Sequence, residues 1–308
     1  MRKKKGFTLV ELLVVIAIIA LLMGILMPAL ARVRQIAFRM TCGTNLSGIG
    51  KAMLIYANDY EDELPRAGGR NTQWGGLVIW DAPDRFAAYS LSADGSGGVA
   101  TISSSFYMLV KYAEVTPKSF VCKGDSGTTD FKLADYPNRN PLVEELINAW
   151  DFGDEPRQHC SYSYHVPYGL YALTTSSEPG MAVAADRNPW IESPAAEAKD
   201  FSLFIPDIPP QFNGTTDQGK YGNAIAHQED GQNVLFMDSH VEFEKRAWCG
   251  VEDDNIYTLL PQGLGLPQKG EPPIVFTSVP GHRKDSLLVN DGPPGAGPGG
   301  APAPARRR

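Results

Sequence analysis

The sequence predicts an α+β fold in which a long N-terminal helix leads into a globular domain built on an antiparallel sheet. Three observations support this fold class. Residues 12–31 are apolar or small without interruption, "LLVVIAIIALLMGILMPALA". An apolar stripe at helical spacing continues to about residue 60. Beyond that point, short runs rich in β-branched and aromatic residues alternate with Gly, Pro and Ser, which is typical of strands joined by turns.

The apolar run is long enough to cross a membrane once. Twenty helical residues rise about 30 Å, which is the thickness of the hydrocarbon core of a bilayer. Arg2, Lys3, Lys4 and Lys5 precede the run, and basic residues next to a spanning helix stay on the cytoplasmic side. We therefore expect a single-pass membrane protein whose C-terminal domain is periplasmic or extracellular.

The helix is expected to continue past the membrane, over residues 7–60. Apolar side chains recur there mostly every three or four residues, at Val33, Ile36, Met40, Leu46, Ile49, Met53, Tyr56 and Tyr60. Gly43, Gly48 and Gly50 weaken this helix, and Pro28 should kink it because its ring removes one backbone hydrogen bond. Such a helix measures roughly 75–80 Å, and its stripe should pack on the domain that follows.

Residues 61–290 form the predicted globular domain. The runs "SFVCKG" (119–124), "CSYSYHV" (160–166) and "GMAVAAD" (180–186) are expected to be strands, because β-forming residues are bounded by turn formers. The run "LVEELINAWDF" (142–152) is expected to be a short helix.

The end of the domain predicts a hairpin and then a tail. "QNVLFM" and "HVEFEK" flank Asp238 and Ser239, and two turn-forming residues between two such runs indicate a β-hairpin. Residues 291–308 are dominated by Gly, Pro and Ala. This composition buries too little apolar surface to fold, so we expect a disordered tail.

The charge and the cysteine content limit the kind of partner and the compartment that we expect for this protein. The formal net charge is −7, and without the seven basic residues at the two ends it is −14. An acidic body argues against nucleic acid as a partner, because phosphate contacts need clustered Lys and Arg. The four cysteines fit no zinc spacing and are compatible with two disulfides in an oxidising compartment, with three possible pairings. They are Cys42, Cys122, Cys160 and Cys249.

Glu11 distinguishes among three interpretations of the N-terminus. A secretory signal peptide would be cleaved after "ALA" at 29–31, but the apolar stretch exceeds the usual length of about 7–15 residues and has no use for a carboxylate. A plain single-pass anchor explains the length but not Glu11, because a charge within a spanning helix costs on the order of 2.5–3.5 kcal/mol. By default, a charge in that position needs a partner.

The third interpretation supplies the partner through a resemblance. "KGFTLVELLVVIAIIALL" strongly resembles the class III signal of type IV pilins and type II secretion pseudopilins, and the resemblance covers roughly residues 3–30. It implies a leader of residues 1–6 and cleavage by a prepilin peptidase between Gly6 and Phe7. It also implies N-methylation of the new N-terminal residue, Phe7.

The same resemblance assigns roles to two residues of the helix. Glu11 matches the family's glutamate, which meets the N-terminal amine of a neighbouring subunit, and Pro28 matches its helix-melting proline. Pairing the two charges removes the desolvation cost of both. The resemblance implies an inner-membrane structural subunit without catalytic residues. It would assemble with other pilin-like subunits into a type II secretion pseudopilus or a type IV pilus-like filament.

A second resemblance lies near the C-terminus. "AHQEDGQNVLFMDSHVEF" (226–243) is similar to the signature of a group of pilin-like proteins from planctomycete-type bacteria, a histidine followed after nine residues by Asp-Gly. Here ten residues separate His227 from Asp238, and Ser239 stands in place of the glycine. "CGTNLSGIGKAMLIYANDYEDELP" (42–65) likewise resembles the stretch after the anchor in that group. Membership of this group implies how the protein is placed in the membrane and that it assembles with other subunits, but it implies no particular biochemical activity.

A group of His, Asp and Glu residues near the C-terminus can be explained either as a metal site or as ordinary turn and surface residues. His227, Asp238 and His240, together with Glu242, are candidate ligands if the hairpin brings them together. Asp238 is also explained as a turn residue whose side chain bonds the backbone. His240 and Glu242 are also explained as the solvent-facing side of one strand.

Three further hypotheses concern the outer domain. The acidic stretches 58–65 and 250–255 offer oxygen ligands for calcium, but neither fits an EF-hand, and a solvated acidic surface explains them as well. The five tryptophans allow a binding function, in which a minor pilin or adhesin binds a glycan or a protein partner, although packing in the core explains them as well. An extracytoplasmic metal protein or enzyme built on the candidate ligands is a third class.

Overall fold

The computed structural model describes residues 9–76, 78–261 and 266–293. The leader 1–6 and the processing residues Gly6 and Phe7 lie outside the described residues, as does the expected tail from residue 294 onward.

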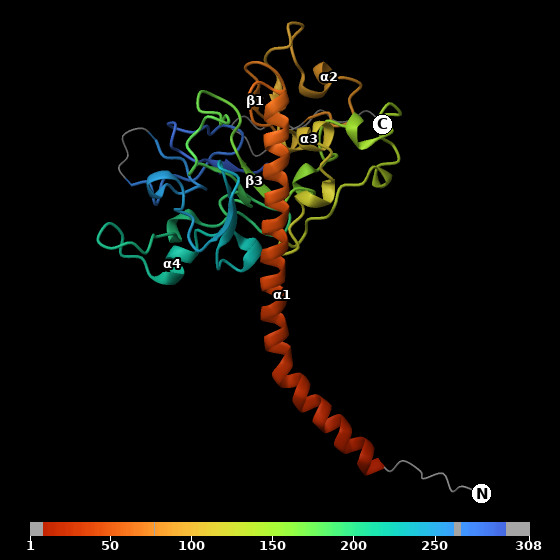
Figure 1. Ribbon diagram of the computed structural model, residues 1–308, viewed down its shortest axis with the longest axis vertical. Coiled ribbons are helices and arrows are strands. Elements are labelled where there is room, and N and C mark those ends of the chain that lie inside the picture. The colour runs from red at the N-terminus through yellow and green to blue at the C-terminus, as the bar shows by residue number, and fades with distance from the viewer. Residues whose placement is uncertain (1–8, 77, 262–265, 294–308) are drawn as a thin grey trace, which may run out of the picture.

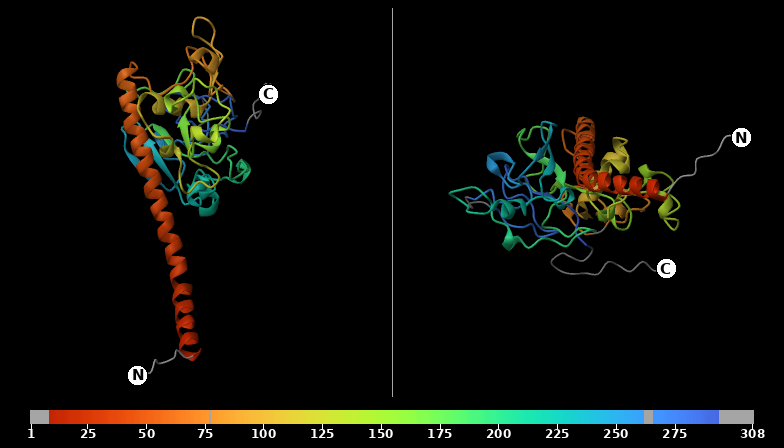
Figure 2. Two further views of the ribbon diagram at one scale, coloured as in Figure 1. Left: turned by 90° about the vertical axis from the view of Figure 1, so that its right-hand side faces the viewer. Right: turned by 90° about the horizontal axis from the view of Figure 1, so that it is seen from below.

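The long N-terminal helix is present as one continuous element, α1 (Leu9–Asp59), of 51 residues. At 1.5 Å per residue it is about 76 Å long, as the sequence predicts. Its lower half projects from the domain as a stem, while its upper half lies along one side of the domain (Figures 1 and 2). Pro28 lies inside α1, and the projecting half is bent (Figure 1).

A five-stranded antiparallel sheet forms the centre of the described domain, which confirms the α+β fold class. Its strands run in the order β6-β5-β4-β3-β7. Their bounds are β3 (Tyr162–His165), β4 (Ala182–Asp186), β5 (Gln232–Phe236), β6 (Val241–Glu244) and β7 (Leu288–Val289). The predicted hairpin is confirmed as β5 and β6, which pair directly, and two of the three predicted single strands are β3 and β4.

Smaller elements surround this sheet. The strands β1 (Gln73–Trp74) and β2 (Val99–Ala100) form a separate parallel pair. The short helices are α2 (Arg85–Tyr89), α3 (Ile102–Tyr112) and α4 (Thr216–Lys220). Turns of 3-10 helix join them at η1 (Pro117–Phe120), η2 (Leu133–Asp135), η3 (Leu146–Asn148), η4 (Pro156–Gln158), η5 (Phe201–Leu203), η6 (Ile225–His227) and η7 (Val251–Asp253).

Two local predictions were wrong. Residues 119–124 form no strand, because their backbone groups bond within turns: Val121 N–H donates to Lys118 and Asp125 N–H to Cys122. Residues 142–152 contain only the single turn η3 instead of a helix, since the chain there turns to pair Trp150 N–H with the Trp80 carbonyl.

The apolar stripe of α1 divides into two parts. From Cys42 onward its inward side chains are buried in the core, including Leu46, Ile49, Met53 and Tyr56. Val33, Ile36 and Met40, which the sequence predicts to pack on the domain, are instead 61%, 49% and 70% exposed. Full burial therefore begins at Cys42, about two-thirds of the way along the helix.

Two of the three glycines in the upper half of α1 lie where the helix packs closely on the sheet. A Cβ on Gly50 would lie 2.7 Å from Leu235 Cδ1, and one on Gly43 would lie 3.1 Å from Asn233 Oδ1. Both neighbours belong to β5, so glycine lets the helix backbone approach the sheet closely. Gly48, by contrast, has nothing within 4 Å of such a Cβ.

The described chain stays ordered beyond the predicted end of the domain. Asp291, which the sequence places in the tail, is buried. It accepts hydrogen bonds from the backbone N–H groups of Ile102 and Ser103, at 2.9 and 2.8 Å, and from Trp74 Nε1. These are the first N–H groups of α3, which have no partner within the helix, so the carboxylate caps it.

Candidate functional site

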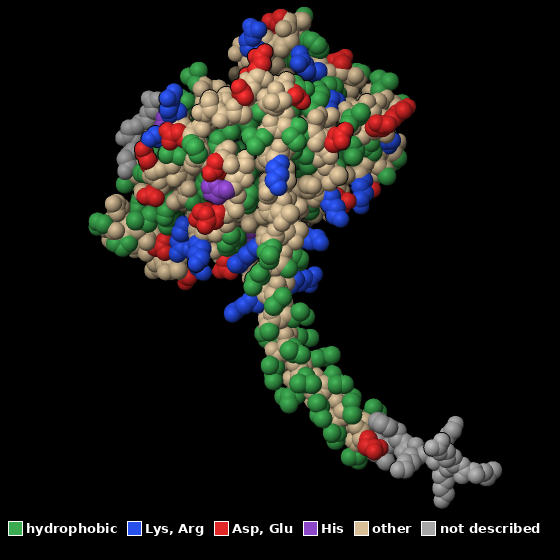
Figure 3. All heavy atoms as spheres, in the orientation of Figure 1, with side chains coloured by type: hydrophobic (Ala, Val, Ile, Leu, Met, Phe, Trp, Pro, Cys, Tyr) green, Lys and Arg blue, Asp and Glu red, His purple; other side chains and the backbone are tan. Residues whose placement is uncertain are grey.

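The projecting half of α1 exposes an apolar surface on every side. The face of the stem seen in Figure 3 is covered by hydrophobic side chains, with acidic side chains at its tip and on the domain. Residues with at least 45% exposure include Leu9, Val10, Leu12, Leu13, Ile16, Ile18, Leu21, Leu22, Ile25, Leu26, Met27 and Leu30. A helix that is apolar all round is stable only when lipid or other apolar surfaces surround it.

The helix also meets the length and composition needed to cross a membrane. Its most apolar stretch has a mean hydropathy of 3.1, and none of that stretch is buried within the molecule. A soluble core helix would be buried by its own fold, which this stretch of α1 is not. Arg32 and Arg34 follow directly on this stretch, and Figure 3 shows basic side chains where the stem enters the domain. The apolar surface therefore ends at a basic boundary.

Glu11 lies in the first turn of α1 and is the acidic residue there. Its side chain is exposed at the far end of the stem, on the same surface as the apolar residues. A carboxylate near a helix N-terminus is favoured by the helix dipole. The role of Glu11 in assembly stays a prediction.

The C-terminal signature residues separate into two places. His227 ends η6 and is buried, with Nε2 3.1 Å from Asp186 Oδ2 on β4. Asp238 and His240 lie at the exposed hairpin turn, where Asp238 Oδ1 is 2.5 Å from His240 Nδ1. In the described part of the chain, no group of three or more potential metal ligands includes Asp238 or His240. The structure thus does not bring the three candidate ligands together.

Ser239 occupies a position of the hairpin turn where glycine is usual. Ser239 has φ of +70°, and its N–H donates to the Phe236 carbonyl. A left-handed residue at the end of a three-residue hairpin loop is usually glycine. Asp238 Oδ1 also accepts the His240 backbone N–H at 3.2 Å, so this carboxylate stabilises the turn.

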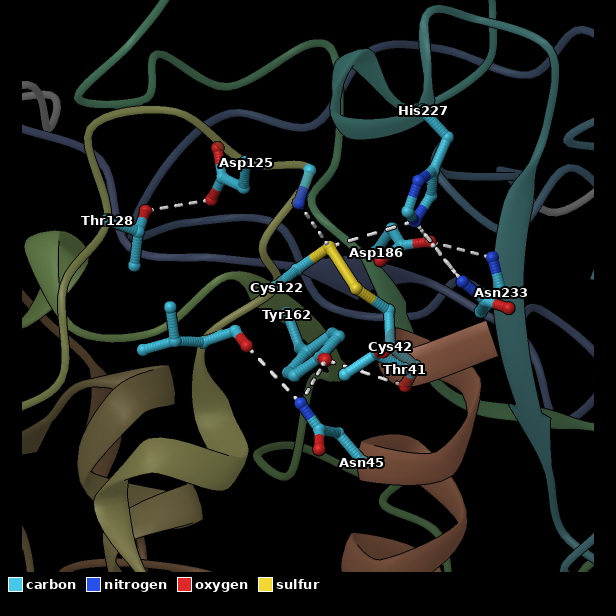
Figure 4. The surroundings of a disulfide bond; sticks show 12 residues. Thr41, Cys42, Asn45, Cys122, Asp125, Thr128, Tyr162, Asp186, His227 and Asn233 are labelled. Atoms are coloured by element: carbon cyan, nitrogen blue, oxygen red, sulfur yellow. Dashed lines mark hydrogen bonds and ion pairs between the residues drawn. A yellow bond between two sulfur atoms is a disulfide. The ribbon is translucent and has the colours of Figure 1, made fainter. Parts of the chain in front are cut away.

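The cysteines form one disulfide in the described chain instead of the two that their number permits. Cys42 of α1 is bonded to Cys122 in the loop after η1 (Figure 4), while Cys160 and Cys249 are free thiols. Burial raises the pKa of Cys160 to about 12 and that of Cys249 well above its usual value. Both thiols are therefore unreactive at neutral pH.

The acidic stretches proposed for calcium have partners of other kinds. In 58–65, Glu63 pairs with Arg66 at 3.0 Å. In 250–255, Glu252 pairs with Lys284, and the buried Asp254 carboxylate accepts the Ser286 N–H at 2.8 Å. Calcium binding stays a prediction.

An aromatic groove at the upper end of α1 was not foreseen from the sequence. Tyr56 and Tyr60 stack with their ring centroids 4.1 Å apart, and Tyr112 lies 5.6 Å from Tyr60. Arg70 and Arg85 line the same groove. The one available signal was the i, i+4 spacing of Tyr56 and Tyr60, since the remaining residues come from other segments.

Comparison with known families finds a match at the N-terminus. The model of the prokaryotic N-terminal methylation motif matches residues 1–27. The chain carries this motif. It is thus a prepilin-like protein with a type IV pilin- or pseudopilin-like N-terminus, and the motif implies processing by the prepilin peptidase. Together with the apolar helix, it indicates membrane anchoring before assembly with the C-terminal domain outside. No curated protein and no solved structure matches the chain.

Proposed function

We propose that this protein is a structural subunit of a pilus-like filament, either a type II secretion pseudopilus or a type IV pilus-like fibre. Prepilin peptidase cleaves it between Gly6 and Phe7 and methylates Phe7. The observation that carries the proposal is the stem itself: an all-round apolar half-helix directly continuous with the methylation motif. The outer domain and its candidate ligands have no catalytic role in this function.

Assembly follows from the surface of the stem. While the subunit waits in the inner membrane, lipid covers the apolar half of α1. When the subunit leaves the membrane, that surface must be covered by the stems of other pilin-like subunits, since exposed apolar surface costs about 25 cal/mol per Å². The stems therefore form the filament core, and the domains lie outside it.

The pairing of Glu11 sets the register of neighbouring stems. Cleavage produces an ammonium group at Phe7, four residues from Glu11 in the sequence. In an apolar filament core each charge is costly alone, and removing one partner of such a pair costs about 3–5 kcal/mol. The stem of the next subunit is thus held where its amine meets the carboxylate of Glu11.

The first test of this proposal is the mass of the N-terminal peptide from membrane-extracted protein. A peptide beginning at methylated Phe7 supports the proposal, and an N-terminus at Arg32 would overturn it in favour of an ordinary signal peptide. The second test is Glu11→Ala, with Glu144→Ala, an exposed carboxylate on the domain, as control. Glu11→Ala should insert into membranes normally and lose filament incorporation by more than about 100-fold, from the cost above. Incorporation equal to that of the control would refute the register argument.

The aromatic groove supports a second candidate function, binding of an acidic glycan by the outer domain of a minor, adhesin-like subunit. Tyr60 and Tyr112, which are 38% and 46% exposed, offer apolar ring faces for sugar rings. Arg70 and Arg85 offer forked donors for carboxylate or sulfate groups, beside the carboxylates of Glu63 and Asp94 in the same lining. The test is binding of the full chain to an array of acidic and neutral glycans, with Tyr60→Ala against Lys118→Ala as control. Equal binding of both variants, or no binding, would exclude the groove.

A further inference from the structure

Four potential metal-ligand atoms meet beside the disulfide, and the sequence singles out only His227 among them as a candidate ligand. They belong to Cys42, Cys122, Asp186 and His227, and all four residues are buried. Their ligand atoms lie within 4.8 Å of one another. Figure 4 shows the side chains converging from α1, the loop after η1, the end of β4 and η6. Four segments far apart in the sequence thus supply one atom each.

The distances in this cluster suit tetrahedral coordination. His227 Nε2 lies 3.1 Å from Asp186 Oδ2 and 3.7 Å from Cys122 Sγ. With zinc bonds of about 2.0–2.3 Å, the ligand atoms of a tetrahedral site are about 3.3–3.8 Å apart. These two edges are therefore near the required length already. The sulfur–sulfur edge differs because the two atoms are bonded to each other in the disulfide.

The surroundings have two further features of a metal site. Asp186 Oδ1 is buried without a hydrogen-bond partner in the described part of the chain. Its other oxygen, Oδ2, is held by Asn233, whose backbone N–H and side-chain Nδ2 donate at 2.7 and 3.1 Å. An outer partner of this kind orients a ligating carboxylate. His227 also lines a groove between α1 and the domain, next to Gly124.

We propose that the dithiol form of this chain, which exists before the disulfide forms, binds one Zn²⁺ through Cys42, Cys122, Asp186 and His227. Binding converts both thiols to thiolates, so two protons are released for each ion bound and no oxidation state changes. Two thiolates, an imidazole and a carboxylate in tetrahedral geometry are a ligand set that suits zinc. The disulfide and the zinc site exclude each other, because disulfide sulfurs offer no thiolate.

Both forms hold the same two segments together. The disulfide joins α1 covalently to the loop after η1, and the zinc site would join the same pair and add β4 and η6. The helix is therefore fastened to the sheet before oxidation as well as after it.

The test compares two forms of the full chain in detergent, so that its main comparison needs no variant. The dithiol form is kept reduced with a phosphine and freed of metal with a chelator, and the disulfide form is left oxidised. Each is titrated with Zn²⁺ against a chromophoric chelator, and with Co²⁺ to record the absorption of thiolate-bound, tetrahedral cobalt. We expect one tight site per chain in the dithiol form, with thiolate-to-cobalt absorption, and none in the disulfide form.

Variants then locate the ion. Asp186→Asn and His227→Gln each remove a ligand and should weaken binding by more than the about 10- to 100-fold expected when Asn233→Ala removes an outer partner. Cys160→Ala is the matched control, since this thiol is also buried but lies outside the cluster. Equal zinc binding by the dithiol and disulfide forms would overturn the proposal. So would a folded dithiol form that binds no ion, or a loss of binding in Cys160→Ala alone.

Discussion

Removing the Cys42–Cys122 disulfide should lower the free energy of unfolding by an amount that depends on the length of the loop it closes. The bond closes a loop of 80 residues in sequence. In the chain-entropy treatment, a cross-link over such a loop removes about 15 cal/mol/K from the unfolded chain, or about 4.5 kcal/mol at 25 °C. The double variant Cys42→Ala, Cys122→Ala should therefore lower the free energy of unfolding by up to about 4.5 kcal/mol, together with the smaller loss from removing two buried sulfur atoms.

The free thiols provide the matched control. Cys160→Ala with Cys249→Ala also removes two sulfur atoms, one buried and one partly buried, but breaks no cross-link. Urea unfolding in detergent, with chelator present, is followed by tryptophan fluorescence, since all five tryptophans lie in the domain beyond α1. The difference between the two double variants isolates the cross-link. A difference below about 0.5 kcal/mol would refute the entropic reasoning, because the predicted term is several times larger.

Three further outcomes are expected from urea unfolding of single variants. Ser239→Gly should stabilise the domain by about 0.5–1 kcal/mol, because glycine adopts the left-handed turn conformation without strain; an unchanged midpoint would contradict this. Gly50→Ala should destabilise by about 1–3 kcal/mol by overpacking, whereas Gly48→Ala, with open space around its Cβ, should stabilise slightly. Burial, and then the charge of Asp291, raises the pKa of Asp151 to about 7. Since the folded state binds that proton more tightly than the unfolded state, with its pKa of about 3.9, stability should fall as pH rises from about 4 to about 7; Asp151→Asn should flatten this slope.

The features that the sequence predicts correctly depend on neighbouring residues. The stem is evident from residues 12–31 alone, because composition and length suffice to identify a helix that suits lipid. The β5–β6 hairpin is likewise encoded by two apolar runs and the residues between them. The strand expected at 119–124 is not encoded in this way. Its apolar residues fit a strand, but only the Phe120 carbonyl bonds the chain beside β3, by accepting the Ser161 N–H, while the N–H groups of Val121 and Asp125 bond within turns.

The arrangement around the disulfide lies beyond such local patterns. Asp186 carries no motif, and its contact with His227 spans β4 and η6. The choice of Cys122 over Cys160 as the partner of Cys42 depends on how the loop after η1 meets α1, and four cysteines alone leave three pairings open. Similarly, the periodicity of α1 gives the inward face but not the level at which burial begins, which depends on where the domain ends.

The level along α1 at which burial begins affects how the proposed filament subunit would resist force on its stem. The lower half of α1 must pass from lipid to contact with other stems, while the upper half must stay on the sheet throughout. Any force on the stem acts first on the turn where the helix meets the domain, because peeling begins at an end of a contact. Cys42 lies in that turn and is the first buried residue of α1. A cross-link placed there resists peeling at its starting point, whereas the same bond near Tyr56 would leave the lower contacts to break one after another. The position of the disulfide along the helix therefore suits a subunit whose stem is moved while its domain stays folded.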